Sequence, residues 1–429
     1  MALQLVSDVS FPGRNPIPPR APLPPDAAAY ADFMTGLHLT PAGLATVDNT
    51  SPVFLTTASL TPGFYYDQDG VIQRTTAARW TRREFDARSG LPLGLRIEGA
   101  YTQRVVSSQR QVLTNGTAVG AVIAPSGSAA EPWQQWYSLT PSGAGEASVT
   151  FATSAIATAG TNLYTSIDAR GSGIVQVGSA GTGHANFNLR TGQVQAFDGA
   201  AAQMIPRPGG IWTLFVRGLV PVGGLEDVAI YAASVAAMDT PKRGASGIPA
   251  EIISPRLYSA GAANRGWAHP WPDTATATHN AESLQPNYTG WTQNGDFSCV
   301  FSLRTGAIPG AAGSSFAVLG TNGISIRAGG NGNMFVVNSA NNQGIWDSGV
   351  PYRALTQYRV GISRTGDRVA VAINDRGFEI AGLSLGGVLR IGGAANTTTH
   401  EFVGWLEKAI FWVDGRPQAR LLQMMETWL

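Results

Sequence analysis

The side chains that could cleave a glycosidic bond are few in this sequence, and their spacing is unfavourable. Enzymes of that kind need two carboxyl groups facing each other across the substrate, which acids at alternate positions of one strand can supply. The closest match is Glu84-Phe85-Asp86, but Arg88 and Ser89 stand where a third acid would be needed. The pair also lies directly before a turn signal. We therefore predict no catalytic residues, and a glycan depolymerase is the least favoured function.

Metal and phosphate chemistry has equally little support in the sequence. The five histidines are scattered, and His400-Glu401 lacks the second histidine of a zinc-protease motif because Gly404 stands in its place. No lysine follows the glycine-rich run Gly178–Gly183, so we interpret that run as a turn. The single cysteine, Cys299, excludes an intrachain disulfide and a cysteine-based metal cluster. We predict no cofactor and no metal site.

Aromatic side chains offer a different kind of chemistry, the binding of sugars. Pyranose rings present apolar C–H faces that stack on aromatic rings, while their hydroxyl groups pair with planar polar side chains. One aromatic cluster lies in the segment EPWQQWYSL, and further tryptophans lie in and after a proline-containing connector. At each position a core or interface residue is the alternative. The candidate carbohydrate-binding residues are Trp133, Trp136, Tyr137, Trp267, Trp271 and Trp291.

The composition indicates many short elements joined by tight turns. The 429 residues include 52 glycines, 44% are hydrophobic and only 13% are charged. A weakly charged surface suits packing against other chains, so we expect a homo-oligomer of unspecified number. The net charge of +1 provides no basic field for nucleic acid. We expect neither a membrane helix nor a secretory signal, because no long apolar run and no basic N-terminal region are present.

The segment FPGRNPIPPRAPLPP near the N-terminus is rich in proline and therefore extended. It can lie as an arm in a groove of a neighbouring subunit, since a pre-extended segment loses little entropy on docking; a flexible linker is the alternative. From Asp26 to Leu39, the N-cap residue Asp26, several alanines and a stop signal at Gly36 predict one short helix. Residues 1–50 are thus predicted to be an anchoring arm. The predicted anchoring residues are Phe11, Pro16, Pro18, Pro19, Pro22, Pro24 and Pro25.

Residues 51–105 are predicted to form a small β connector. Asp69-Gly70 is a hairpin signature flanked by strand-forming residues. Ser89-Gly90 marks a second turn. Asp67 and Asp69 do not form a calcium loop, because the other ligands of an EF-hand are missing, so we predict a hairpin.

Two blocks of short alternating strands follow. From 106 to 260, segments such as ASVTFATSAI and IWTLFVRGLV alternate apolar and polar residues between turn signals, which indicates a β-sandwich. Residues 261–429 contain a connector and a second block of strands, with a hairpin turn at Gly366-Asp367. In the final segment RPQARLLQMMETWL, apolar residues fall on one helical face after Pro417. A short C-terminal helix packed on the second sandwich is therefore predicted.

Residues 64–105 resemble a module of bacteriophage virion proteins. In that module an aspartate-glycine turn precedes a run of the form D-x-x-T/S-G-x-P-x-G-L-x-I-E-x-A-x-T-N. Arg96 and Gln103 depart from the run, where the module has an aliphatic residue and an asparagine. We expect Glu98 and Thr102 to make structural hydrogen bonds. The matching residues are Asp69, Gly70, Asp86, Ser89, Gly90, Pro92, Gly94, Leu95, Ile97, Glu98, Ala100 and Thr102.

Two later segments extend the resemblance. HANFNLRTGQVQAF with GGIWTLFVRG is similar to the core of carbohydrate-binding-module-like sandwiches in such proteins, although Asn188 replaces the usual aspartate. HNAESLQPNYTGWTQNGDFSCVFSL and the closing strand and helix resemble a concanavalin-like sandwich. The implied fold is all-β, with two jelly-roll or concanavalin-like β-sandwiches. The implied order is the arm (1–50), the connector (51–105), the first sandwich (106–260), and a connector with the second sandwich (261–429).

The resemblance implies a virion structural protein, such as a head spike or tail fibre component of a phage or a phage-like gene transfer agent. We expect the arm to anchor the chain to capsid or tail proteins, and the sandwiches to bind host-surface polysaccharide for attachment. The alternative is an architectural adaptor that binds no glycan and carries a second fibre protein. We expect assembly in the host cytoplasm and a final location in the virion.

Overall fold

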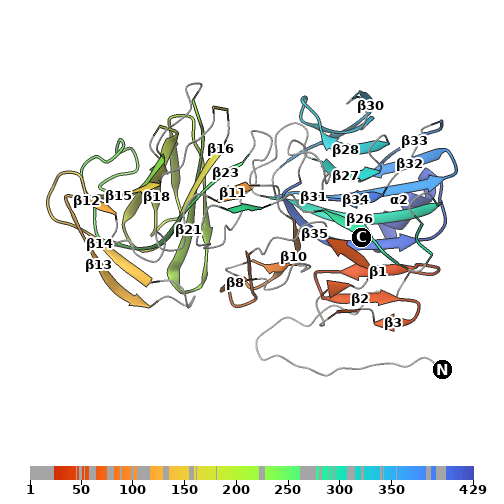
Figure 1. Cartoon of the computed structure of the whole chain (residues 1–429), viewed down its shortest axis with the longest axis horizontal. Helices are drawn as coiled ribbons and strands as arrows, with labels where there is room; N and C mark the ends of the chain where they lie inside the picture. Colours follow the sequence, from red (N-terminus) through yellow and green to blue (C-terminus); the bar gives the residue numbers. More distant parts are fainter. Residues whose placement is uncertain are drawn as a thin grey trace.

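The computed structural model shows an all-β chain, as predicted, with a single short α-helix among the described residues (Figure 1). Two β-sandwiches lie side by side, and strands from the N-terminal part of the chain lie against the second one. The described residues are 24–44, 46–47, 51–52, 54–57, 64–74, 82–86, 89–97, 101–103, 116–128, 135–153, 159–160, 162–179, 181–221, 228–260, 277–279, 283–288, 290–292, 295–306, 315–319, 323–338, 341, 343–353, 355–382, 388–392 and 402–429.

The first sandwich packs two antiparallel sheets around a core that includes Leu139, Ile167, Val175, Phe187 and Leu214, all fully buried. One sheet has the order β13 (Ala121–Ser128), β14 (Gln135–Pro141), β23 (Ala250–Ala260), β16 (Asn162–Gly171), β21 (Ile211–Leu219) and β20 (Ala201–Pro206); β11 (Tyr101–Gln103) joins it beside β23 and pairs with β24 (Ala277–His279). The other sheet has the order β12 (Thr117–Val119), β15 (Ser148–Thr153), β22 (Val228–Val235), β17 (Ile174–Ser179), β18 (Gly183–Asn188) and β19 (Val194–Phe197).

The second sandwich is built in the same way around buried residues such as Phe301, Phe316, Ile326 and Val360. One sheet has the order β3 (Gly43–Leu44), β2 (Leu37–Thr40), β1 (Ala29–Asp32), β35 (Gly404–Trp412), β26 (Phe297–Thr305), β31 (Gln357–Thr365), β32 (Arg368–Ile373) and β33 (Arg376–Ile380); β10 (Pro92–Ile97) also pairs with β35 and carries β9 (Arg82–Phe85). The other sheet has the order β30 (Gly344–Pro351), β29 (Asn333–Asn338), β28 (Ile324–Ala328), β27 (Ser315–Leu319), β34 (Leu389–Ile391), β25 (Leu284–Pro286) and β6 (Leu55–Thr57).

The predicted helix over Asp26 to Leu39 is wrong, because this segment is a β-hairpin of β1 and β2. The turn between them is closed by Asp32, whose side-chain Oδ1 accepts hydrogen bonds from the amides of Met34 and Thr35 at 2.9 and 3.0 Å. Gly36, expected to end a helix, instead has a φ of +76° in this turn. Strand β1 also pairs along β35. The ladder with β35 thus outweighs the modest helical preference of the alanines.

The predicted division of the N-terminal part into an arm and a separate connector is also wrong for the described strands. Strand β1 pairs with β35, β10 pairs with the same strand nearer its start, and β6 pairs with β25. Pro24 is buried, and the carbonyl of Pro25 accepts a hydrogen bond from the Trp412 indole at 3.4 Å. Strands of this part therefore complete the second sandwich. The anchoring candidates Phe11, Pro16, Pro18, Pro19 and Pro22 lie outside the described residues.

A small hairpin of β7 (Phe64–Tyr66) and β8 (Ile72–Arg74) connects the two sandwiches. Its Asp69-Gly70 turn is present as predicted, and Gly70 has a φ of +73°. On the first sandwich, the Arg207 guanidinium donates to the Gly70 carbonyl at 3.2 Å, and the Tyr66 hydroxyl lies 3.0 Å from that of Thr213. Towards the second sandwich, the Tyr66 amide donates to Glu84 of β9 at 3.4 Å. The β7–β8 hairpin therefore makes polar contacts with both sandwiches.

Two buried charge clusters lie at this junction. Asp168 of β16 is fully buried and pairs with Arg207 at 3.2 Å and with Arg256 at 2.5 Å. Glu84 is also buried and accepts a hydrogen bond from the Trp405 indole at 2.6 Å. Arg96, the residue that departs from the virion module, lies 3.5 Å from the Glu84 carboxylate. Its charge at this position therefore compensates a buried acid.

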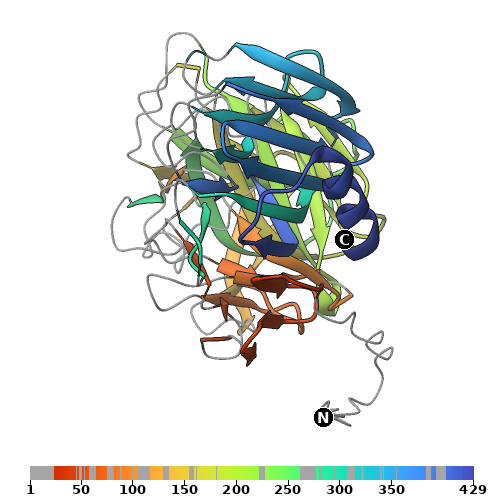
Figure 2. The same cartoon turned by 90° about the vertical axis from the view of Figure 1, so that its right-hand side faces the viewer.

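The predicted C-terminal helix is α2 (Gln418–Trp428), which follows Pro417. Its buried residues Leu421, Met424 and Met425 lie on the outer face of the sheet that contains β31 and β32 (Figure 2). A side chain at Gly361 on β31 would come within 3.3 Å of Leu421 and Met425. The helix thus needs a small residue beneath it and covers one end of the outer face.

Candidate functional site

The tryptophans predicted to bind sugars do not form an exposed platform where the structure describes them. Trp136 is only 2% exposed, and the Arg170 guanidinium lies 4.4 Å from the centre of its ring system. Tyr137, on the opposite face of β14, belongs to the core of the first sandwich. The prediction that these two residues bind sugar faces is therefore wrong, because their rings are already covered.

Trp291 is half-buried and packs against the core of the second sandwich. Its ring lies 5.6 Å from Tyr288 and 5.0 Å from Phe297 between centroids. These aromatic contacts explain its position without a ligand. The remaining candidates Trp133, Trp267 and Trp271 lie outside the described residues.

The acids considered for catalysis serve the fold. Glu84 holds Trp405 and Arg96 inside the protein, whereas the Asp86 carboxylate accepts hydrogen bonds from the amide and hydroxyl of Ser89, both at 2.7 Å. The first acid is thus buried in a structural cluster, and the second closes the predicted turn before β10. Glu84 therefore has almost no exposed surface, and Asp86 is engaged by the turn.

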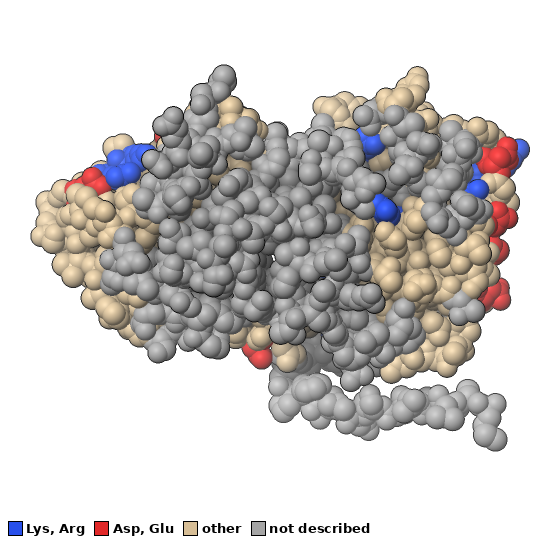
Figure 3. Space-filling view, in the orientation of Figure 1, with Lys and Arg blue, Asp and Glu red and all other residues tan. Residues whose placement is uncertain are grey.

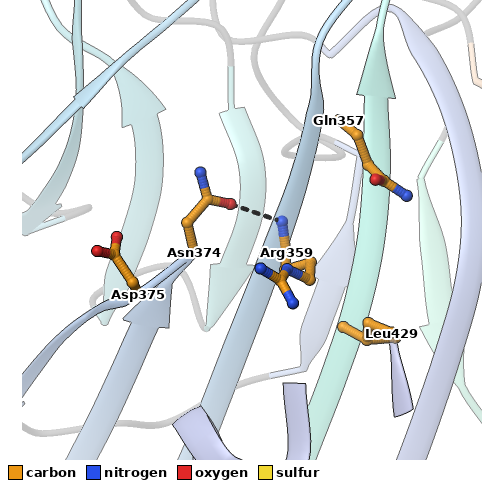
Figure 4. Close-up of a pocket in the computed structure, with 5 residues that line it drawn as sticks. All are labelled: Gln357, Arg359, Asn374, Asp375 and Leu429. Atoms are coloured by element: carbon orange, nitrogen blue, oxygen red, sulfur yellow. Dashed lines mark hydrogen bonds between the residues drawn. The ribbon is translucent and has the colours of Figure 1, made fainter. Parts of the chain in front are cut away.

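A pocket of about 300 Å³ lies beside the end of α2. Figure 4 shows its lining residues, Gln357, Arg359, Asn374, Asp375 and Leu429. Gln357 and Arg359 come from β31, while Asn374 and Asp375 form the turn between β32 and β33. Leu429 directly follows α2. Alternation on β31 places Gln357 and Arg359 on the outer face, because Tyr358 and Val360 point into the core.

Two hydrogen bonds between Arg359 and Asn374 fix the turn at the pocket. The Arg359 amide donates to the Asn374 side-chain oxygen at 3.0 Å, and the Asn374 amide donates to the Arg359 carbonyl at 2.8 Å. Asn374 has a φ of +53°, a conformation that asparagine tolerates better than most residues. The side chain of Asn374 is therefore held in one orientation before any ligand arrives.

A buried acid orients Gln357 at the other side of the pocket. Glu407 of β35 is 2% exposed and accepts hydrogen bonds from the Gln357 amide nitrogen and from Arg304 Nε, the latter at 2.8 Å. Among the described residues, no hydrogen bond engages Oε1 of Gln357, which leaves this oxygen as an acceptor. The pocket thus combines two amides, one guanidinium and one carboxylate.

These groups can bind hydroxyl groups, but they do not form the acid pair of a glycosidase. Asp375 is the one carboxylate among the five lining residues, and its side chain is 81% exposed. Acid–base cleavage of a glycosidic bond needs a second carboxyl group within about 5–10 Å. The pocket lining is therefore suited to binding by planar polar side chains.

Sequence reasoning missed this pocket because its residues lie on separate segments in a block of ordinary hairpins. It also missed Trp346 of β30, which stacks on Phe378 of β33 with centroids 5.5 Å apart and an interplanar angle of 9°. Both rings are half-buried. Among the described residues, no three histidine, cysteine, aspartate or glutamate side chains gather to hold a metal ion, and no helix is long and apolar enough to span a membrane.

Comparison with models of protein families finds no match, and neither does comparison with curated proteins. Among solved structures, the carbohydrate-binding module CBM40 of the Ruminococcus gnavus IT-sialidase, bound to α2,3-sialyllactose, is 13% identical with a TM-score of 0.25; the match covers 30% of this chain and 82% of that one. A SAP-like pentraxin from Limulus polyphemus is 15% identical with a TM-score of 0.23 and covers 30% and 69%. A Trypanosoma rangeli sialidase is 9% identical with a TM-score of 0.27 and covers 57% and 48%. Similarities at this level carry no argument about function.

Proposed function

We propose that this chain is a non-enzymatic protein that binds host-surface carbohydrate through the pocket at the end of α2. The observation that carries the proposal is the convergence of Gln357, Arg359, Asn374 and Asp375 on one open pocket of about 300 Å³. Such amide, guanidinium and carboxylate groups pair with sugar hydroxyl groups. The volume lies at the lower end of the usual range for small-ligand pockets, about 300–1,000 Å³, and suits a single sugar ring.

The proposed setting is a virion, in which the chain serves as a head spike or tail fibre component. The resemblance of residues 64–105 and of both sandwich segments to phage virion proteins supports this setting. The weakly charged surface agrees with packing among particle proteins, and Figure 3 shows that charged side chains cover little of the described surface in that view. We propose capsid or tail proteins and further copies of this chain as its partners.

Arg359→Gln is expected to weaken binding of host-surface polysaccharide about tenfold or more, because it removes a charged donor from the pocket. The matched control is Arg368→Gln, since Arg368 is 64% exposed and pairs with Glu379 away from the pocket lining. Titration calorimetry with size-fractionated polysaccharide measures both variants, and thermal unfolding verifies that each is folded. Equal affinities for Arg359→Gln, Arg368→Gln and the natural protein would place the glycan elsewhere.

Deletion of residues 1–23 is expected to abolish incorporation into particles while leaving the glycan affinity of the purified protein unchanged. The cut is placed here because β1 and β2 belong to the second sandwich, so a longer deletion to residue 50 would damage the fold as well. Incorporation is measured by the amount of the chain in purified particles. Normal incorporation of the deleted chain would show that the proline-rich segment is no anchor.

A further inference from the structure

A second group of polar side chains lies on the outer face of the first sandwich, on three adjacent strands. Tyr231 of β22 pairs directly with Gly178 of β17, which pairs directly with His184 of β18. A Cβ at Gly178 would lie 2.7 Å from the Tyr231 hydroxyl and 2.7 Å from the His184 Cβ. The missing side chain at Gly178 therefore lets the tyrosine hydroxyl lie next to the histidine.

Tyr231 and His184 are buried but incompletely hydrogen-bonded. Tyr231 is 0% and His184 is 3% exposed, yet the Tyr231 hydroxyl and the His184 Nε2 have no hydrogen-bond partner among the described residues. His184 Nδ1 lies 3.2 Å from the carboxylate of Asp198, which faces solvent. Buried polar atoms without partners are uncommon in folded proteins and call for an explanation. A bound ligand that supplies the missing partners is such an explanation.

Two cations lie over the same tyrosine ring. Lys242 Nζ and Arg243 Cζ are 5.0 and 4.8 Å from the centroid of Tyr231, and Lys242 is exposed to solvent. Burial and the neighbouring Arg243 lower the pKa of Lys242, so the two like charges are unfavourable together. Glu146 lies 3.9 Å from Arg243, and the Asp198 carboxylate offsets part of the charge of Lys242. An additional negative charge would be favourable at this position.

The loop that carries both cations is held in place by buried amides on the sheet. The Gln176 side-chain oxygen accepts a hydrogen bond from the Arg243 amide at 2.6 Å. The Asn186 side-chain nitrogen donates to the carbonyls of Met238 and Thr240 at 2.9 and 3.0 Å. The backbone of the loop that carries the cations is thus positioned in advance, which reduces the entropy lost when a ligand binds.

We infer that Tyr231, His184, Lys242 and Arg243 form a site for the carboxylate-bearing sugars of an acidic polysaccharide, such as hexuronic acids. The carboxylate pairs with Lys242 and Arg243. Their side chains lie over the Tyr231 ring and move aside, so that ring hydroxyl groups reach the buried Tyr231 hydroxyl and His184 Nε2. A singly charged carboxylate fits better than a phosphate, because Asp198 and Glu146 already offset much of the positive charge. This inference deepens the proposed function and rests on it, but it uses the other sandwich.

The variant Tyr231→Phe distinguishes a ligand-binding role of the Tyr231 hydroxyl from a structural role. The hydroxyl has no partner among the described residues, so its removal is expected to leave the melting temperature unchanged or slightly higher. Affinity for a glucuronic-acid-containing oligosaccharide is expected to fall about five- to tenfold, while affinity for a neutral oligosaccharide of equal length is unchanged. Unchanged affinity of folded Tyr231→Phe for the acidic oligosaccharide would overturn the inference.

The role of the cations is tested with the double variant Lys242→Gln and Arg243→Gln. The control is Lys408→Gln, which removes the other lysine of the sequence, in β35 of the second sandwich. The double variant is expected to lose the preference for acidic over neutral oligosaccharide and the salt dependence of binding. Lys408→Gln is expected to keep both. A natural protein that binds neutral and acidic oligosaccharides equally would overturn this inference alone. A natural protein that binds no glycan would overturn the proposed function as well.

Discussion

Asp168→Ala is expected to lower the free energy of unfolding by about 3–5 kcal/mol, because it leaves two arginines buried without their shared counter-charge. Arg207 and Arg256 are 3% and 4% exposed in their side chains and both contact the Asp168 carboxylate. The neighbouring Tyr66 shows how dry this cluster is. Burial raises the pKa of Tyr66 to about 12, although the charges of Arg207 and Arg256 act to lower it. Water therefore cannot replace the carboxylate easily.

The effect of Asp168→Ala is measured by urea unfolding followed through tryptophan fluorescence. Asp239→Ala is the matched control, since Asp239 is exposed in the loop after β22, and it is expected to change the free energy of unfolding by less than about 0.5 kcal/mol. The interpretation of a buried, stabilising pairing would be abandoned if Asp168→Ala unfolded at the same urea concentration as Asp239→Ala.

Glu84→Ala is expected to have the second-largest effect, a loss of about 3–4 kcal/mol in the free energy of unfolding. It removes the acceptor of the Trp405 indole at 2.6 Å, and it leaves Arg96 buried beside that ring at 5.1 Å. It also removes the acceptor of the Tyr66 amide, so contact between β9 and the β7–β8 hairpin is weakened. The substitution therefore weakens contacts of Glu84 with both β7 and β35.

Glu84→Gln and Glu379→Ala serve as comparisons for this variant. The glutamine keeps an oxygen acceptor but loses the charge that faces Arg96, so we expect an intermediate loss. Glu379 forms an exposed pair with Arg368, and its replacement is expected to cost no more than about 1 kcal/mol. Thermal unfolding measured by circular dichroism ranks the three variants. Equal melting temperatures for Glu84→Ala and Glu379→Ala would show that the buried contacts of Glu84 add no more to stability than the exposed pair of Glu379.

Local features of the fold were predictable from sequence because their causes are local. Alternating apolar residues identify strands such as β15 and β21, and the Asp69-Gly70 and Gly366-Asp367 turns connect hairpins as predicted. The helix after Pro417 also follows from its own apolar periodicity. These elements depend on neighbours within a few residues, so the sequence pattern is sufficient.

Long-range pairing could not be predicted in the same way. The alanines of β1 favour a helix in isolation, whereas in the fold this segment pairs with β2 on one edge and with β35, far along the chain, on the other. The same limit applies to the candidate site. Whether Trp136 is covered depends on Arg170 of another strand, and the pocket brings together residues of β31, a later turn and the end of α2. Composition and periodicity carry no information about such partners.

The pairing of β1 with β35 has a consequence for the order in which the chain is made. At a synthesis rate of about 5–20 residues per second, Asp32 leaves the ribosome about 20–75 seconds before its partner Lys408. The first sandwich has all its own strands in between and can fold during that interval. Until β35 has been made, the edge of β1 that pairs with it stays exposed, so the β1–β2 hairpin carries an open strand edge during that interval.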